Sequence, residues 1–144
     1  MAYFIESVNG TPRLFCGDTL FAGGCGRLFE GTPAQLHASL HTLSALPAET
    51  LAYCAHEYTA SNLAFASAVE PRNAALAQRV ASTAALRAAH QPTVPFVLGQ
   101  ERLTNPFLRT AEPHVIASAS QHAGLAMNDA VDVFTVLREW KNGF

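Results

Sequence analysis

The sequence predicts an α/β unit over residues 1–58 followed by an all-helical unit over residues 59–144. The first unit is predicted because strand-like and helix-like segments alternate along it, and the second because helical patterns dominate there. Apolar residues make up 49% of the 144 residues and charged residues only 14%, so the chain has enough apolar material for a packed core. The predicted fold class is therefore α/β plus α.

The α/β unit is predicted to open with a β-hairpin. Apolar and aromatic residues dominate residues 2–8 and end at Val8, Asn9-Gly10 is a strong two-residue turn signal, and residues 13–16 form the return strand. Residues 17–31 are rich in glycine, which is unfavourable inside a helix or a strand. This segment is predicted to be a long loop whose backbone lies close to another part of the molecule.

A helix and a buried strand are predicted next. Thr32 can cap the helix ahead of Pro33, and Pro47 ends it. The apolar face of this helix consists of Leu36, Leu40, Leu43 and Leu46. Residues 51–54 are a short apolar run, which predicts a buried strand that leads to His56.

The second unit is predicted to consist of helices joined by one irregular stretch. Residues 61–69 have helical composition, and Asn73 can cap a further helix that runs to about Ala89. Prolines recur within residues 91–109, so this stretch is expected to be largely irregular. Asn128-Asp129 can cap a last helix whose inward residues are Ala130, Val133, Phe134 and Leu137.

Two polar residues follow predicted strands of the first unit. Asp18 follows the return strand of the hairpin, and His56 follows the strand over 51–54. On neighbouring strands they would point into one crevice, where open α/β sheets bind their ligands. They could act as metal ligands, or His56 as a general base, although two protein ligands are fewer than a stable metal site needs. The alternatives are an Asx turn at Asp18 and an ordinary loop histidine at His56.

Other polar and thiol groups are less informative. His37 and His41 have a spacing that can bind zinc, but without an acidic partner they are interpreted as the solvated side of a helix, and His90, His114 and His122 are interpreted in the same way. Cys16 and Cys54 are interpreted as small core residues, while Cys25 lies between glycines and could be a reactive thiol. Arg138 and Lys141 share one helix face, either as a clamp for a carboxylate or as charges that complement the helix dipole.

Charge and composition exclude some partners and indicate a compartment. The formal net charge is −2, which disfavours nucleic-acid binding through a broad basic surface. No apolar run approaches the roughly 18 residues of a membrane-spanning helix, so no membrane partner is expected. Three cysteines, an odd number, and the lack of a signal-peptide pattern predict reduced thiols in a cytoplasmic protein.

Several motifs, in the same order along the chain, resemble glyoxalase II, or hydroxyacylglutathione hydrolase, of the metallo-β-lactamase fold superfamily. They are GDTLFAGGCGRLFEGT over 17–32, CAHEYT over 54–59, PTVP over 92–95, NPFLR over 105–109 and LREWK over 137–141. The resemblance covers essentially the whole chain. It implies the C-terminal half of an αββα sandwich over residues 1–58 and a helical glutathione-binding domain over 59–144.

The resemblance also implies roles for seven residues. Asp18 matches the aspartate that bridges two divalent metal ions, and His56 matches a histidine ligand of the second ion. Zinc is the first expectation for these ions, with iron or manganese as alternatives. The residues implied to bind glutathione are Arg27, Phe29, Tyr58, Arg138 and Lys141, and Phe29 replaces a tyrosine found in many members.

The family activity implied is hydrolysis of S-D-lactoylglutathione to glutathione and D-lactate, a step of methylglyoxal detoxification. Two metal ions share the attacking hydroxide, since a metal lowers the pKa of bound water from 15.7 to roughly 7.

The sequence departs from the family in one respect. The family's Thr-His-x-His-x-Asp-His motif is not present, and of its metal-ligand positions only Asp18 and His56 are found. The chain therefore resembles the C-terminal portion of the enzyme and is expected to be inactive alone, with an exposed apolar sheet face that pairs with a missing N-terminal half or with itself. The alternatives are a binding module that holds glutathione conjugates without hydrolysis, and one half of a split enzyme.

Overall fold

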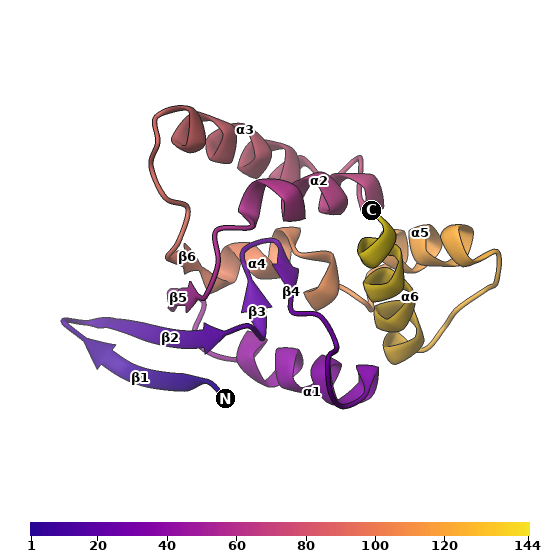
Figure 1. The fold of residues 1–144 in the computed structure, drawn as a ribbon, viewed down its shortest axis with the longest axis horizontal. Coiled ribbons are helices and arrows are strands. Elements are labelled where there is room, and N and C mark those ends of the chain that lie inside the picture. The colour runs from indigo at the N-terminus through magenta and orange to yellow at the C-terminus, as the bar shows by residue number, and fades with distance from the viewer.

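The computed structural model of the chain is a mixed α/β structure with a small sheet at one end and helices around it (Figure 1). It describes residues 1–144 except for the side chain of Val8. The predicted strand that ends at Val8 is therefore described there by its backbone alone. The elements are β1 (Tyr3–Val8), β2 (Thr11–Gly17), β3 (Leu20–Phe21), β4 (Gly24–Cys25), α1 (Pro33–Ser44), β5 (Leu51–Cys54), α2 (Thr59–Val69), α3 (Ala74–Ala88), β6 (Phe96–Val97), α4 (Leu98–Thr104), the 3-10 turn η1 (Pro106–Leu108), α5 (Pro113–Ala123) and α6 (Ala130–Gly143).

The main sheet has the strand order β1-β2-β5-β6. The β1–β2 hairpin is antiparallel, and its turn residues Asn9 and Gly10 both have positive φ, 53° and 83°, as a type I′ turn requires. Strands β2 and β5 are parallel, and α1 connects them. The predicted hairpin and the predicted order of strand, helix and strand are therefore confirmed.

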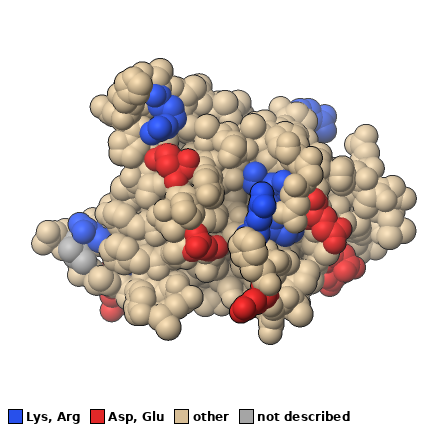
Figure 2. Space-filling model, viewed as in Figure 1, with Lys and Arg blue, Asp and Glu red and all other residues tan. Residues whose placement is uncertain are grey.

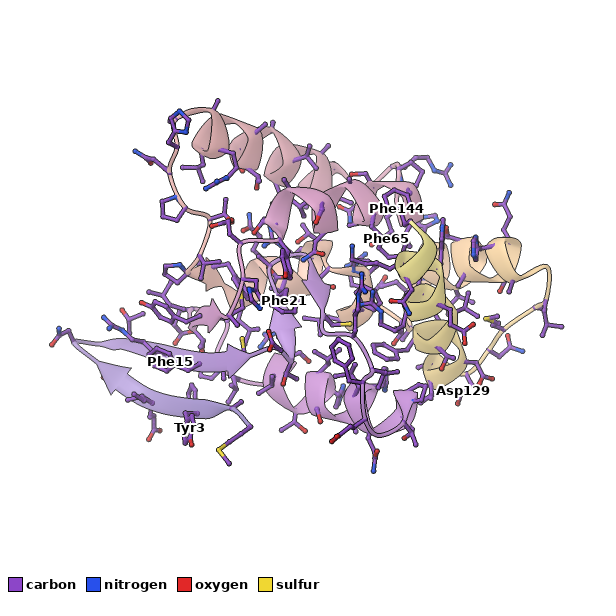
Figure 3. The ribbon with its side chains drawn as sticks, viewed as in Figure 1. Tyr3, Phe15, Phe21, Phe65, Asp129 and Phe144 are labelled. Atoms are coloured by element: carbon purple, nitrogen blue, oxygen red, sulfur yellow. The ribbon has the colours of Figure 1, made fainter. Side chains whose placement is uncertain are left out.

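The two faces of this sheet have different surroundings. On one face Leu14 and Ala52 are fully buried and pack in the core with Leu40 of α1 and Leu98 of α4. The opposite face is open and carries large apolar side chains in cross-strand register. The exposed members are Tyr3 (64%), Ile5 (45%), Phe15 (40%) and Val97 (43%). Figure 3 shows Tyr3 and Phe15 on the hairpin that extends away from the helices.

Three helices begin at the predicted caps. Thr32 forms a capping box with Gln35 at the start of α1, and Asn73 accepts a hydrogen bond from the Leu76 amide at the start of α3. Asp129 accepts from two backbone amides at the start of α6. Each side chain satisfies amide groups that lack a partner within the helix, which explains why these boundaries could be predicted.

The helices share one apolar core with the buried face of the sheet. Phe65 of α2 stacks on Phe107 at a centroid distance of 5.8 Å, and Phe134 of α6 packs edge-on to Phe107. Phe65 also lies beside Phe144, the last residue, as Figure 3 shows. None of the described helices is both long and apolar enough to span a bilayer.

Two expectations were wrong in part. Residues 17–31 are not loop throughout, because β3 and β4 pair as a two-stranded hairpin. Residues 91–109 are not largely irregular, because β6 pairs with β5 at the edge of the main sheet and α4 follows at once. The strands β3, β4 and β6 have only two residues each, too few to show a period of two in the sequence. The helix α5 was not singled out from the sequence.

Candidate functional site

A cleft of about 610 Å³ opens where the ends of β2 and β5 meet the β3–β4 hairpin, α2 and α6. All seven residues singled out by the family resemblance line it. They are Asp18, Arg27, Phe29, His56, Tyr58, Arg138 and Lys141. In Figure 2, Lys and Arg side chains gather near the middle of this face, in the region that Figure 1 shows between β4 and α6, and acidic side chains lie nearby.

A second cleft, of about 540 Å³, lies between α2, α3 and α5. Its described lining contains none of those seven residues. The first cleft is therefore the one to which the sequence motifs point.

Asp18 and His56 meet at one side of the cleft. The Asp18 Oδ1 and His56 Nε2 atoms are 3.4 Å apart, and both side chains are at least half exposed. They come together because each follows the end of a strand, and β2 and β5 are neighbouring parallel strands with Gly17 opposite Cys54. The expectation that both residues point into one crevice is confirmed.

Aromatic rings hold the His56 side chain. The His56 ring stacks on Tyr58 with centroids 4.9 Å apart and planes inclined by 20°. Phe21 packs against Tyr58 at 5.4 Å and against His56 at 6.1 Å. This packing restricts the imidazole on its ring face and leaves its edge to the carboxylate of Asp18.

The two potential metal ligands are not enough to hold an ion. In the described part of the chain, no group of three or more His, Cys, Asp or Glu side chains is arranged to hold a metal. Catalytic zinc sites normally have three protein ligands. Asp18 and His56 could supply two of them, so the residues of this chain do not by themselves fit a metal centre.

Arg27, Arg138 and Lys141 form a cationic part of the lining, here named the cationic wall. Arg138 is only 4% exposed, and its Nη1 donates to the carbonyl oxygens of Cys25 at 2.9 Å and Gly26 at 3.3 Å. Its Nη2 donates to Asn142, while its buried Nε has no hydrogen-bond partner among the described residues. Arg27 follows Gly26 directly, and its side chain is exposed.

Lys141 lies one helical turn from Arg138. Burial, reinforced by the nearby charges of Arg138 and Arg27, lowers the pKa of Lys141. Like charges that face one cleft disfavour each other, and an anion between them would relieve that cost. The charge of this wall therefore favours a carboxylate ligand over a cationic one.

The aromatic residues at the rim differ in exposure. Phe29 is 87% exposed and Tyr58 is 50% exposed. Both can contact a ligand without rearrangement of the core. Phe29 has no hydroxyl, so it can offer only apolar contact.

The structure corrects two further interpretations. His37 is not on a solvated helix side: its Nε2 lies 3.0 Å from the Thr110 hydroxyl, its ring packs edge-on to Phe134, and burial lowers its pKa. Cys25 is not a reactive thiol, because burial raises its pKa to about 11 and only the thiolate is nucleophilic. Cys25 is part of β4 and is only 4% exposed, which the glycine-rich sequence around it did not reveal.

Sequence reasoning missed several polar residues around the cleft. Ser61 and Asn62 of α2 line it, and Glu101 and Asn105 lie behind the hairpin that forms its wall. Asn105 belongs to the NPFLR motif and the other three are polar residues of predicted or observed helices, but nothing in the sequence assigned a role to any of them. A polar residue in a helix does not by itself distinguish a functional residue from an exposed one.

Comparison with known proteins gives one consistent result. A family model described as hydroxyacylglutathione hydrolase C-terminus matches residues 57–144. The chain is 58% identical over 144 residues to a hydroxyacylglutathione hydrolase of Cupriavidus taiwanensis, covering all of this chain and 54% of that protein. It is 57% identical over 135 residues to the protein of the same name from Aeromonas hydrophila, covering 94% of this chain and 53% of that protein.

A third relative, the hydroxyacylglutathione hydrolase of Pseudomonas aeruginosa, is 57% identical over 134 residues, with 93% of this chain and 52% of that protein covered. The chain therefore spans about half the length of the curated relatives it matches.

Proposed function

Because this chain belongs to the hydroxyacylglutathione hydrolase family, we propose that it forms the glutathione-binding part of a thiolester hydrolase. The observation that carries the proposal is the cleft, which brings a cationic wall and two potential metal ligands into the lining of one cavity. The proposed substrate of the whole protein is S-D-lactoylglutathione, and the products are glutathione and D-lactate, as a step of methylglyoxal detoxification.

The cationic wall binds the peptide end of the substrate. Arg27 and Lys141 provide charges for a carboxylate. Arg138 is buried in the wall and holds the Cys25 and Gly26 carbonyls beside Arg27. Charge-assisted hydrogen bonds of this kind are about twice as strong as neutral ones. Tyr58 and Phe29 contact the ligand at the rim.

Asp18 and His56 face the reacting end of the substrate. In the proposal they are two ligands of a metal centre, with zinc as the first expectation and iron or manganese as alternatives. In the proposal the remaining ligands come from the part of the relatives' length that these 144 residues do not span. We therefore expect the chain alone to bind glutathione but not to hydrolyse the thiolester.

The open sheet face is the proposed contact with that other part. Tyr3, Ile5 and Phe15 form an apolar surface on the side of the sheet away from α1 and α4. In the proposal, this sheet is one half of an αββα sandwich, residues 59–144 are the glutathione-binding domain, and the second sheet covers the open face. Without that cover, the face would favour association of two copies of the chain.

One alternative function has support from a specific observation. The described residues offer only two neighbouring metal ligands, so the chain could act as a module that binds glutathione conjugates without hydrolysis. A split enzyme assembled from two chains is a related possibility, and it would use the same open sheet face.

The test combines calorimetry and catalysis on the purified chain. Titration with glutathione is expected to show binding that Lys141→Ala and Arg27→Ala weaken about tenfold each, since each removes a charge-assisted contact. The matched control is Arg87→Ala, because the exposed Arg87 lies on α3 outside the cleft lining and its described side-chain hydrogen bond goes to the Gln91 carbonyl.

Hydrolysis of S-D-lactoylglutathione and metal content are measured on the same sample. No turnover together with substoichiometric metal is the expected result. Turnover with bound metal would show that the ligand set is complete in this chain, and no binding of glutathione would reject the proposed function.

A further inference from the structure

The tip of the β3–β4 hairpin, residues 22–26 and here named the glycine turn, is held by polar side chains from other elements. The Ala22 carbonyl accepts from Asn62 Nδ2 at 3.1 Å, and the Gly24 carbonyl accepts from Asn105 Nδ2 at 3.0 Å. The Gly23 amide donates to Glu101 Oε2 at 2.9 Å. Side chains from α2, α4 and the residue after α4 therefore determine where the glycine turn lies.

Glu101 is the centre of this arrangement. Its side chain is fully buried, and it forms an ion pair with Arg79 of α3, which is 4% exposed. Its Oε2 accepts from both the Gly23 amide and Asn105 Nδ2, the latter at 2.9 Å. A buried carboxylate is stable only when a countercharge and hydrogen bonds satisfy it, so the glycine turn supplies part of what Glu101 needs.

The glycine turn fits its surroundings closely. Gly23 has a φ of +72°, and a Cβ atom there would lie 2.7 Å from Leu63 Cδ2. At Gly24 a Cβ atom would lie 2.7 Å from Asn62 Cγ. The turn therefore lies against α2 with no space for a side chain, and small displacements meet neighbouring atoms.

The cationic wall depends on the same turn. Arg138 donates to the carbonyls of Cys25 and Gly26, and Arg27 is the next residue. A displacement of the glycine turn would move the acceptors of Arg138 and the backbone from which the Arg27 side chain extends. Glu101 and Asn105 do not line the cleft, so any effect they have on a ligand passes through the turn.

We infer that Glu101 and Asn105 are positioning residues that hold the glycine turn and thereby set the cationic wall of the cleft. The inference rests on the proposed glutathione-binding function for its effect on a ligand. Its effect on the turn itself does not depend on that function.

Glu101→Gln removes the negative charge of the side chain and keeps its shape. A glutamine has one carbonyl oxygen, and the Arg79 guanidinium attracts it. The amide NH2 group then faces the Gly23 amide and Asn105 Nδ2, where two donors meet and no bond forms. The hydrogen bond to Gly23 is therefore lost while the size of the side chain is kept.

Thr104→Val is the matched control. The Thr104 hydroxyl accepts from Arg79 Nη1 at 2.7 Å and donates to the Gln100 carbonyl at 2.7 Å, so its described hydrogen bonds do not include the glycine turn. This substitution removes both of these hydrogen bonds and keeps the side-chain shape. It should lower stability to a similar degree without a change in the turn.

Two readouts on the 144-residue chain test the inference. Amide hydrogen exchange by NMR is expected to show a protected Gly23 amide in the wild type and exchange at least about tenfold faster in Glu101→Gln, after correction for global stability. Thr104→Val should leave the corrected Gly23 exchange rate unchanged. Glutathione, titrated by calorimetry, should bind about fivefold to tenfold more weakly to Glu101→Gln and with wild-type affinity to Thr104→Val.

Each outcome decides a separate question. Equal effects of Glu101→Gln and Thr104→Val on Gly23 exchange would overturn the inference and reduce Glu101 to a contributor to stability. If Glu101→Gln does not fold, an unprotected Gly23 amide in the wild type would overturn the inference, and a protected one supports it. If the wild type does not bind glutathione, the proposed function is rejected, and the exchange data alone decide whether the turn is positioned by Glu101.

Discussion

Substitution of Gly26 tests whether the close approach of two backbone segments holds the cleft together. A Cβ atom at Gly26 would overlap the Asp18 carbonyl oxygen and lie 3.2 Å from the Asp18 carbonyl carbon. The Gly26 amide also donates to the Thr19 carbonyl at 3.1 Å, and the Gly26 carbonyl accepts from Arg138. Gly26→Ala must therefore move backbone at the start or at the end of the hairpin.

The magnitude follows from what the added methyl group meets. Overpacking against side chains costs about 1–3 kcal/mol, because side chains can adopt other rotamers. Here the obstacle is backbone in a buried segment with hydrogen bonds on both sides, so we expect a loss of about 3 kcal/mol or more in the free energy of unfolding. For a chain of this length, that loss corresponds to a fall in Tm of roughly 10 °C.

Urea unfolding is the assay, followed by the fluorescence of Trp140. This residue is the only tryptophan, and it packs edge-on to Phe65 in the core. Gly143→Ala is the control, because nothing lies within 4 Å of a Cβ atom there, and its unfolding free energy should stay within about 0.5 kcal/mol of the wild type. A Gly26→Ala protein within 1 kcal/mol of the wild type would refute the reasoning that this close approach is required.

Three further predictions concern the rim, the open sheet face and the thiols. Phe29→Tyr restores a hydroxyl at an 87% exposed rim position and should tighten glutathione binding several-fold by calorimetry, whereas unchanged affinity would show that the side chain does not reach the ligand. Ile5→Lys places a charge on the open sheet face and should shift sedimentation towards the monomer, while Leu125→Lys, at a 68% exposed site elsewhere, should not. Burial raises the pKa of Cys16 to about 12 and that of Cys25 to about 11 from an ordinary value of 9.0. Both thiols should therefore resist alkylation at pH 8 until the chain unfolds. Because the folded state keeps these protons longer than the unfolded state, their contribution to stability is complete below about pH 9 and is lost as the pH rises through about 11, which urea titrations at pH 8 and pH 10 would detect.

Three helix starts and one hairpin turn could be predicted from the sequence. Thr32, Asn73 and Asp129 indicate helix starts because a short polar side chain satisfies backbone amides within the next turn. Asn9-Gly10 predicts its hairpin because these residues tolerate positive φ. These signals act over a few residues, so they can be recognised without knowledge of the rest of the chain.

Seven of the residues that line the cleft were also predictable, since the motifs name residues even where nothing local explains them. Asp18 and His56 could be placed together from strand ends alone, and the structure brings them to 3.4 Å. Arg27 came from the resemblance alone, because a single arginine has no local signature that separates a ligand contact from a solvated charge. The spacing of Arg138 and Lys141 left two interpretations open, and the resemblance favoured the carboxylate clamp.

Tertiary structure alone decided the arrangement behind the cleft. The strand β6 exists because Phe96 is buried beside Ala52 of β5, a contact between segments far apart in the sequence. Glu101 and the glycine turn are likewise 78 residues apart, and their hydrogen bond forms only when α4 packs behind the hairpin. Capping and turn formation depend on neighbours along the chain, whereas burial of a charge depends on which distant groups surround it. For this reason the sequence by itself determined where three of the helices begin and seven of the residues that line the cleft, and only the packing of distant segments decided what holds the cleft in shape.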